Sequence, residues 1–565
     1  MEEKIRFGEI VYRRPDFKKM QDLINSTVEK INNLQSYEEL KKCIFEYQDN
    51  LKSFNDLYTI VSIRHFQDAT DEFYEKESEE CDREMSMIDT SAVAKAILES
   101  PYVDRINEEF GSEYLAKVES DMKVHAKGKE LQAEEGVLIG KYQQLKAKLT
   151  FNFQGKTMSE GEINPWRKNP DREVRRAATE AIFTGYASKA QEFEEILEKL
   201  IKVRNELAKA NGYATYPEYM DEEKGRRGYG EAELNSFCEE VRKELTPFLL
   251  KMRKKQAESI GVDRITAYDD KVYFIDGNAK PKGSTNDLLK AASTMYHGLS
   301  KEAGEFFDDM VETDFIDCAY SDKKISGMGF ATYLEGSGKS FIFANNNGTT
   351  SDVEVVTHEV GHAFAAYKAM ENHKLSEYIC GTNDIVEVPS MTMEYFAYPY
   401  LKEFFGEDAE KYKYGHMIEA FARVCFFCMT NLFENYIYLN PDISMKERID
   451  EYNRLNDIFD PGVDASMFKE YIDGGVRLFK SMGVYMFPKY LISYSLSEIG
   501  AMAFMQRYSE DRKKAWEDYV TFCKAGGSKP YVELLEIAGL EVPFKEGAVG
   551  RATKYIRELL EEMCK

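Results

Sequence analysis

Apolar residues recur every three or four positions along the first part of the chain. Between residues 17 and about 145, Leu, Ile, Phe and Tyr return at this interval among Glu and Lys, as in DLYTIVSIRHFQDATDEFYEKE, and Pro is sparse. That spacing places apolar side chains on one face of a helix. The pattern therefore predicts a series of long amphipathic helices, and helices are expected to continue to about residue 260.

Two stretches break this helical pattern. Residues 147–159, AKLTFNFQGKTMS, alternate between apolar and polar side chains around Gln154 and Gly155, which predicts a β-hairpin. From about residue 263 to 345, short β-favouring runs are separated by Gly, Pro, Asn and Lys; they are KVYFID, GFATYL and SFIFAN. We expect a small β-sheet in this region, with one helix at about 285–312.

These patterns predict a mainly α fold with more than one lobe. A chain of 565 residues is too long for a single compact core. We place a boundary between two lobes near residue 195. This gives an N-terminal helical lobe with one β-hairpin, residues 1–195, and a second region that holds the chemistry described next, residues 196–565.

The chemistry gathers in the stretch TSDVEVVTHEVGHAFAAYKAM. His358, Glu359 and His362 form the His-Glu-x-x-His pattern of zinc-dependent peptidases. Residues four apart lie on the same face of a helix, so both imidazoles can reach one Zn²⁺ while the Glu projects beside the ion. A Ser-x-x-Glu capping box at Ser351 predicts a helix over about residues 352–370.

A catalytic zinc site usually takes three protein ligands, so a third ligand is expected downstream. Glu387, in the run DIVEVPSMTME, follows His362 at a distance that allows one helix to end and a second to return. Because Pro389 is tolerated near a helix start, Glu387 is expected in or just before the first turn. Glu394, on the same face two turns later, is predicted to orient a ligand His. The alternative for Glu387 is a helix-capping carboxylate paired with Asp384.

These motifs resemble the M3 family of zinc metallopeptidases, in its oligoendopeptidase F branch. The resemblance covers about residues 200–565 closely, through RNELAKANGYATYPEY, NNGTTSDVEVVTHEVGHAF, DIVEVPSMTME, FENYIYLNP and AGGSKP. It implies that His358, His362 and Glu387 bind Zn²⁺, one ion per chain, and that Glu359 is the general base. It also implies a two-lobed helical body with a deep central channel, and we expect the small β-sheet beside the metal helix.

One segment departs from the family pattern. The resemblance places a His and one or more tyrosines, which stabilise the oxyanion, in a C-terminal segment that here reads GVYMFPKYLISYSLSE. Aligned on its proline, the segment has Gly483 in place of the His and Leu491 in place of one tyrosine. Tyr494 is predicted as the remaining donor, with Tyr490 and Tyr485 as possible substitutes that contact substrate. Ordinary packing is the alternative for each tyrosine.

The predicted sheet offers a way to bind peptides. An exposed strand edge can pair with an extended peptide through main-chain hydrogen bonds, without requiring a particular side chain. We place such an edge at residues 329–333, with Gly329 as a substrate-binding candidate, or at residues 341–345. An ordinary paired strand is the alternative in both places.

Composition limits the partners and the setting. Asp and Glu number 100 against 75 Lys and Arg, and the resulting net charge of −25 argues against nucleic acid or an anionic membrane as partner. The longest apolar runs are too short for a membrane span, and the N-terminal residues lack the apolar core of a secretory signal. Nine scattered cysteines fit a reducing cytoplasm. Cys425 and Cys428 are expected in a buried helix rather than in a metal site.

The expected function is that of a cytoplasmic zinc metalloendopeptidase, a hydrolase that cuts internal bonds of short peptides with a zinc-bound water activated by Glu359. The alternative is a slow or inactive peptide-binding relative on the same scaffold, which the departure at Gly483 motivates. A third option is a carboxypeptidase-like specificity, which needs a cation for a terminal carboxylate, such as Arg226, Arg227 or Lys489.

Overall fold

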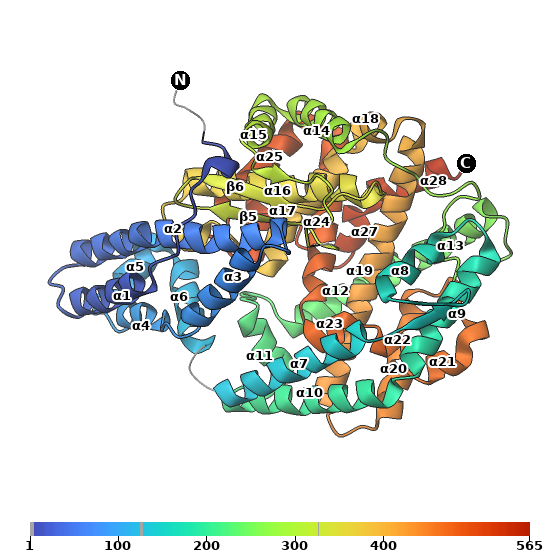
Figure 1. The fold of residues 1–565 in the computed structure, drawn as a ribbon, viewed down its shortest axis with the longest axis horizontal. Helices are drawn as coiled ribbons and strands as arrows, with labels where there is room; N and C mark the ends of the chain where they lie inside the picture. The colour runs from blue at the N-terminus through green and yellow to red at the C-terminus, as the bar shows by residue number, and fades with distance from the viewer. Residues whose placement is uncertain (1–4, 125–127, 326) are drawn as a thin grey trace. The chain divides into compact units, whose positions relative to one another are not determined.

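The computed structural model describes residues 5–124, 128–325 and 327–565 (Figure 1). Helices dominate and the strands are short, which confirms the mainly α prediction. The chain forms two compact units that interleave in sequence. Unit 1 takes Met1–Ala126, Lys280–Ala409 and Arg507–Leu540, and unit 2 takes Lys127–Ala279, Glu410–Gln506 and Glu541–Lys565.

The boundary near residue 195 does not coincide with a passage between these units. Residue 195 lies inside helix α10 (Ala190–Ala210), within unit 2. Each unit is instead assembled from three separate stretches of chain. Periodicity describes one helix at a time, so it carries no information on which distant helices pack together.

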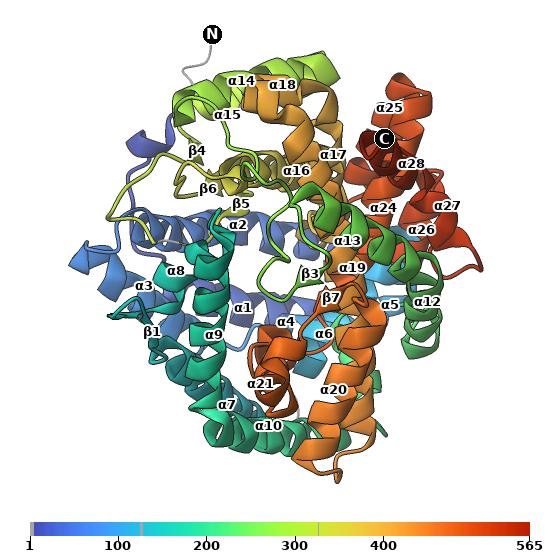
Figure 2. The same ribbon diagram turned by 90° about the vertical axis from the view of Figure 1, so that its right-hand side faces the viewer.

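A three-stranded sheet in unit 1 lies against the helix that carries the His-Glu-x-x-His pattern. Its strands are β4 (Ile316–Asp317), β5 (Phe330–Leu334) and β6 (Lys339–Phe343), in the order β4-β6-β5. Strand β6 is parallel to β4 and antiparallel to β5. Helix α16 (Thr350–Asn372) packs on β5 and β6, as two views of the ribbon show (Figures 1 and 2). The small sheet beside the metal helix is therefore present.

The predictions for residues 263–345 hold in part. The runs GFATYL and SFIFAN form β5 and β6, but KVYFID is irregular. There the side chain of Asn278 replaces strand pairing, because it accepts from the N–H of Tyr273 at 2.9 Å and donates to the carbonyl of Lys271 at 2.8 Å. The single helix expected at 285–312 is two helices, α14 (Thr285–Leu299) and α15 (Lys301–Glu312), since Ser300 caps the second.

The remaining helices of unit 1 come from its N-terminal and C-terminal stretches. The N-terminal helices are η1 (Phe7–Glu9), α1 (Phe17–Asn32), α2 (Tyr37–Gln67), α3 (Glu72–Met85), α4 (Ser91–Leu98), α5 (Val103–Phe110) and α6 (Ser112–Val124). After α16 come η3 (Ser376–Tyr378), α17 (Asn383–Phe396), η4 (Tyr398–Tyr400), α18 (Leu401–Phe405), η5 (Gly406–Asp408), α25 (Arg512–Ala525) and α26 (Tyr531–Ile537). The apolar faces of the N-terminal helices form a core around Ile24, Leu40 and Ile106, as amphipathic periodicity predicts.

Unit 2 is also helical. Its helices are α7 (Lys129–Ala147), α8 (Glu160–Ile163), η2 (Asn164–Lys168), α9 (Arg172–Ala187), α10, α11 (Tyr216–Glu223), α12 (Glu231–Glu244), α13 (Thr246–Ser259), α19 (Ala409–Leu439), α20 (Met445–Phe459), η6 (Ser466–Phe468), α21 (Lys469–Asp473), α22 (Val476–Phe479), α23 (Met482–Met486), α24 (Leu491–Glu510), α27 (Ala548–Ala552) and α28 (Lys554–Met563). Cys425 and Cys428 lie buried in α19, as expected.

The strands of unit 2 are few. The predicted hairpin is present as β1 (Phe151–Phe153) and β2 (Lys156–Met158), which are antiparallel. Its turn residues Gln154 and Gly155 both have positive φ, the conformation of the tightest hairpin turns. A second pair, β3 (Ile265–Thr266) and β7 (Val463–Asp464), is parallel.

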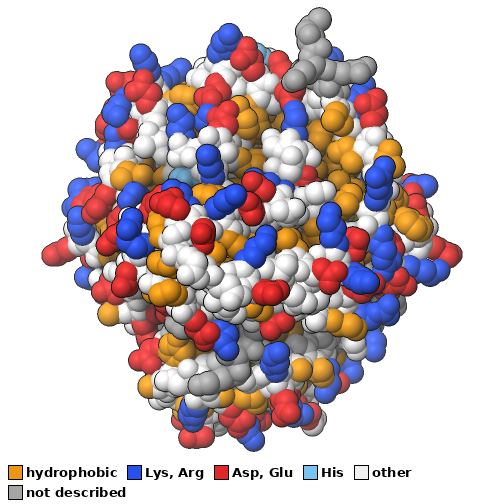
Figure 3. Space-filling view, turned by 90° about the vertical axis from the view of Figure 1, so that its left-hand side faces the viewer, with side chains coloured by type: hydrophobic (Ala, Val, Ile, Leu, Met, Phe, Trp, Pro, Cys, Tyr) orange, Lys and Arg blue, Asp and Glu red, His pale blue; other side chains and the backbone are white. Residues whose placement is uncertain are grey.

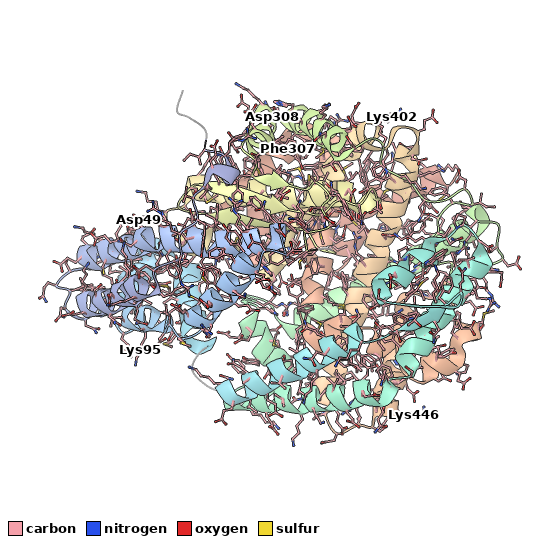
Figure 4. All side chains as sticks on the ribbon, viewed as in Figure 1. Asp49, Lys95, Phe307, Asp308, Lys402 and Lys446 are labelled. Carbon is pink, nitrogen blue, oxygen red and sulfur yellow. The ribbon has the colours of Figure 1, made fainter. Side chains whose placement is uncertain are left out.

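The surface carries both signs of charge. On the face shown in Figure 3, Asp and Glu side chains are interspersed with Lys and Arg. In unit 1, Asp49 on α2 and Lys95 on α4 are exposed and point outward (Figure 4). Among the helices of the described residues, none is long and apolar enough to cross a membrane.

Candidate active site

Helix α16 carries three of the predicted site residues. Its apolar positions Val353, Val356, Val360 and Ala363 are buried, and Tyr367 is half-buried, at the helical spacing of an apolar face. The predicted capping box at Ser351 is wrong, because the helix begins at Thr350, so Ser351 lies inside its first turn. The carboxylate of Asp352 instead accepts the N–H groups of Asn347 and Gly348, at 3.0 and 2.7 Å. A carboxylate in the first turn also suits the positive end of the helix dipole.

A glycine brings the second helix close enough to supply Glu387. A Cβ on Gly361 would lie 2.5 Å from the Cα of Ser390 and 2.9 Å from the carbonyl oxygen of Pro389, so the main chain of α17 occupies the space of a side chain. Glu387 lies a full turn inside α17, later than expected, and Pro389 lies in the helix interior. The sequence reasoning missed Gly361, although glycine inside a helix signals close backbone approach.

The three predicted metal ligands meet at one point. Nε2 of His358 lies 3.2 Å from Nε2 of His362 and 3.2 Å from Oε2 of Glu387. Nε2 of His362 lies 3.3 Å from the same Glu387 oxygen. Ligand bonds of about 2.0–2.1 Å in a tetrahedral zinc site place neighbouring ligand atoms about 3.3 Å apart. The triangle fits such an ion, and among the described residues it is the one group of His, Cys, Asp and Glu that could hold a metal.

Carboxylates surround the two imidazoles. Burial would lower the pKa of His358, but hydrogen bonds to Glu387 and Glu394 raise it well above its usual value. Burial would raise the pKa of Glu387, but His358 and His362 hold it well below its usual range. The arrangement therefore favours positive charge at the centre of the cluster, as a bound divalent cation provides.

Glu394 holds one ligand ring from behind. Its Oε1 lies 2.6 Å from Nδ1 of His358, the nitrogen that faces away from Glu387. A carboxylate in this position fixes the tautomer and the orientation of a ligand His. We expect Glu394→Gln to weaken the binding of a divalent metal ion by about 10–100-fold, measured by competition with a chelator. Glu371→Gln is the control, because Glu371 lies near the C-terminal end of α16, away from His358. If both variants bound the metal ion as tightly as the wild type, Glu394 would have no part in orienting His358.

Glu359 contacts the edge of the sheet. Its buried carboxylate accepts the main-chain N–H of Ala331 in β5. Burial raises the pKa of Glu359 above its usual value, although His358 and His362 lower it. A raised pKa brings a carboxylate closer to the range in which it takes up a proton efficiently near neutral pH. Gly329, just before β5, lets α16 approach, since a Cβ there would lie 2.8 Å from Val355.

Of the two candidate edges, only one has a side that no strand of the described residues covers. Main-chain N–H groups of Ile342 and Ala344 donate to the carbonyls of Phe315 and Asp317, and β6 lies between β4 and β5, so residues 341–343 have a strand on both sides. Residues 341–345 are therefore wrong as the edge. Strand β5 has a strand partner on one side within the described residues. Because pairing alternates along a strand, the main-chain groups of Ala331 and Tyr333 face away from β6.

The predicted tyrosines lie in unit 2. The hydroxyls of Tyr490 and Tyr494 are 3.0 Å apart, and both side chains are half-buried. Tyr485 is fully buried, stacks on Tyr142 with ring centroids 4.2 Å apart, and donates its hydroxyl to the carbonyl of Phe193 at 3.2 Å. Tyr485 is thus a packing residue, and its prediction as a substrate contact is wrong.

Arg226 and Lys489, two of the cations considered as partners for the C-terminal carboxylate of a peptide, already bind groups of the protein itself. Arg226 is buried and pairs with Asp221 at 3.0 Å, and it donates to the carbonyl of Lys489 at 2.9 Å. Lys489 is buried as well, and its Nζ donates to Oδ1 of Asn431 at 2.6 Å. These internal contacts disfavour the carboxypeptidase-like option.

The fold and the site together indicate a class of protein, the helical peptidases whose candidate metal site lies on a His-Glu-x-x-His helix. The profile of Peptidase family M3 matches residues 166–552, and that of the Peptidase M3 N-terminal domain matches residues 7–125. The chain belongs to peptidase family M3, in its oligoendopeptidase F branch. Peptide hydrolysis is the reaction of this family.

Known relatives span nearly the whole chain. Oligopeptidase PepF of Bacillus subtilis (strain 168) is 22% identical over 558 residues, which cover 92% of this chain and 79% of PepF. The solved structure of Pz peptidase A with an inhibitor has a TM-score of 0.88 and 31% identity, covering 99% of this chain and 100% of that one. Oligoendopeptidase-F from Enterococcus faecium shares the fold, with a TM-score of 0.61, 17% identity and 97% coverage of each chain.

Proposed function

We propose that this peptidase is a zinc-dependent endopeptidase that cuts internal bonds of short peptides, with Zn²⁺ held by His358, His362 and Glu387. The observation that carries the proposal is the triangle of ligand atoms, whose sides of 3.2 to 3.3 Å suit a tetrahedral ion. When bound, zinc supplies a Lewis acid that polarises the scissile carbonyl and acidifies water. The similarity to an oligopeptidase and to Pz peptidase A supports short peptides as substrates.

Glu359 is the general base in this proposal. Its carboxylate takes a proton from the attacking water as the water oxygen bonds to the carbonyl carbon. It then passes the proton to the leaving nitrogen as the C–N bond breaks. Its burial and its contact with Ala331 support this role, because they hold the carboxylate beside the strand that we assign to substrate binding. A protein that only binds peptides has no use for such a base, which disfavours the peptide-binding alternative.

The substrate main chain pairs with the outer edge of β5, beginning near Gly329. No strand of the described residues pairs with the outer side of β5, which supports the assignment, since edge pairing binds an extended peptide without reading its side chains. The resemblance supports Tyr494 as the donor to the oxyanion, and its hydroxyl lies 3.0 Å from that of Tyr490. A cytoplasmic setting is proposed on the nine free cysteines.

Gly483 and Leu491, the two positions that depart from the family pattern, lie next to each other in the fold. A Cβ on Gly483 would lie 2.3 Å from Cδ1 of Leu491, so Leu491 fills the space that a longer side chain at position 483 needs. We expect Gly483→His to lower the free energy of unfolding by roughly 1–3 kcal/mol through overpacking, measured by denaturant unfolding. Adding Leu491→Ala is expected to remove most of this loss.

Gly136→His is the matched control for this substitution, because a Cβ on Gly136 meets no atom within 4 Å. A Gly483→His variant as stable as this control would contradict the coupling between positions 483 and 491. We also expect the double variant to turn over faster than Leu491→Ala alone, because the added imidazole is a second oxyanion donor.

Digestion of a mixture of short synthetic peptides, followed by mass spectrometry, tests the proposed function. The protein is stripped of metal with a chelator and then reloaded with Zn²⁺. We expect cleavage at internal bonds only after reloading. Removal of single residues from the C-terminus would indicate the carboxypeptidase-like option instead. Peptide binding without cleavage by the reloaded protein would support the peptide-binding alternative.

A further inference from the structure

Unit 2 buries a lysine directly before helix α24, which carries Tyr494. The side chain of Lys489 is 0% exposed, and its backbone has a φ of +59°, the left-handed region that residues other than glycine rarely adopt. Removing an ammonium group from water costs several kcal/mol unless well-placed partners compensate for it. A buried charge on a strained backbone is therefore a candidate for a residue that fixes a particular arrangement of the chain.

The side chain of Lys489 is held by one face of α19. Its Nζ donates to Oδ1 of Asn431 at 2.6 Å and to Oδ1 of Asn435, and its main-chain N–H donates to Oε2 of Glu434 at 2.8 Å. Glu434 and Asn435 follow Asn431 by three and four residues, so both lie next to it on one face of the helix. Lys489 therefore fixes the position of its own segment along α19 as well as its distance from that helix.

Two buried arginines hold the carbonyl groups of the same segment. Arg226 donates to the carbonyl of Lys489 at 2.9 Å. Arg204 donates to the carbonyls of Val484 and Tyr485, at 2.9 and 2.6 Å. Hydrogen bonds from charged donors are stronger than neutral ones, and those buried are costly to break. The main chain of residues 484–489 is thus held at both ends by charged groups.

The two half-buried tyrosines follow this segment at once. Tyr490 is the next residue, and Tyr494 lies one helical turn further on, with its ring centroid 5.9 Å from that of Phe427 on α19. Ser495 donates to the carbonyl of Val424, also on α19, at 3.1 Å. A shift of Lys489 relative to α19 would therefore displace both tyrosine hydroxyls. A displacement of about 1 Å in a catalytic group can cost about 10²-fold in rate.

We propose that Lys489 is a positioning residue, which sets the hydroxyls of Tyr490 and Tyr494 for the reaction without touching the substrate. This inference rests on the proposed function, in which Tyr494 donates to the oxyanion. It adds to that function the contact between the ammonium group of Lys489 and α19, which affects the reaction only through the positions of the two tyrosine hydroxyls.

The first test is Lys489→Met, which keeps the length of the side chain and removes its charge. Burial already raises the pKa of Glu434 to about 7, so this carboxyl can take up a proton when its cation is removed. We expect kcat to fall by about 10–100-fold, with KM within about twofold and zinc content unchanged. Lys480→Met is the control: Lys480 lies in the same unit with its Nζ 5.2 Å from the centroid of the Phe183 ring, and kcat should stay at the wild-type value.

A double-mutant cycle separates positioning from general damage. In a Tyr494→Phe background, Lys489→Met is expected to cost nothing further in kcat, because the hydroxyl that it positions is gone. An equal loss in both backgrounds would overturn the proposal. A Tyr494→Phe variant with wild-type kcat would also overturn the proposal, because Tyr494 would then not contribute to the reaction. In that event the proposed zinc chemistry would still be supported if Glu359→Gln loses cleavage. If Lys489→Met does not fold, Asn431→Ala replaces it in the cycle, because this substitution removes one acceptor of the Lys489 ammonium group. The expected loss in kcat is then smaller, and it should again disappear in the Tyr494→Phe background.

Discussion

Glu387→Ala is expected to leave a folded protein that does not retain zinc and does not cut peptides. Oε2 of Glu387 forms two of the three sides of the ligand triangle, at 3.2 Å to His358 and 3.3 Å to His362. Two imidazoles alone are an incomplete set, because catalytic zinc sites take three protein ligands. Metal content after dialysis, together with the rate of peptide cleavage, measures the effect.

Glu371→Ala is the control for this substitution, since Glu371 lies on α16 and bonds to Tyr367 and Lys368 rather than to the cluster. This control should retain zinc and activity. A Glu387→Ala protein that still carries one zinc per chain would contradict the ligand assignment. It would favour the other interpretation of Glu387, a helix carboxylate paired with Asp384.

Glu359→Gln is expected to keep zinc and to lose turnover by about 10²–10⁴-fold, the usual contribution of a general base. The substitution is isosteric, and the amide oxygen can still accept the N–H of Ala331, so the geometry of the site is preserved. KM should change little, because the base acts on water rather than on substrate binding. A quenched-fluorescent peptide gives kcat and KM, and zinc content is measured on the same samples.

A loss of zinc in Glu359→Gln would show that this residue supports the metal instead of acting beside it. A kcat within about tenfold of the wild type would contradict its role as base, because so small a loss lies below the range for general base catalysis. Glu371→Gln again serves as the matched control on the same helix.

The sequence was sufficient to predict the parts of the site that are local in the chain. The four-residue spacing of His358 and His362 requires a helix, and α16 covers the predicted range of about residues 352–370. The run around Glu387 also forms a helix, and the structure brings its carboxylate to both imidazoles. The contact between Glu394 and His358 follows from the same two helices.

The features that depend on tertiary contact could not be predicted in this way. The carboxylate of Asp352 holds the loop before α16 by accepting the N–H groups of Asn347 and Gly348, a contact that helix propensity at Ser351 does not reveal. The close approach at Gly361 depends on α17, and the two interleaved units depend on contacts between distant stretches. Local pattern also could not separate Tyr485, which is buried, from Tyr494, which is half-buried, because burial depends on the distant residues that pack around each ring.

The most direct measurement is a comparison of two digests of one peptide mixture, by zinc-loaded wild type and by zinc-loaded Glu359→Gln, with all products identified by mass spectrometry. The account predicts internal cleavage by the wild type and intact peptides with the variant, at equal zinc content. Identical product maps from the two proteins would contradict it, because the cleavage would then not depend on the carboxylate of Glu359.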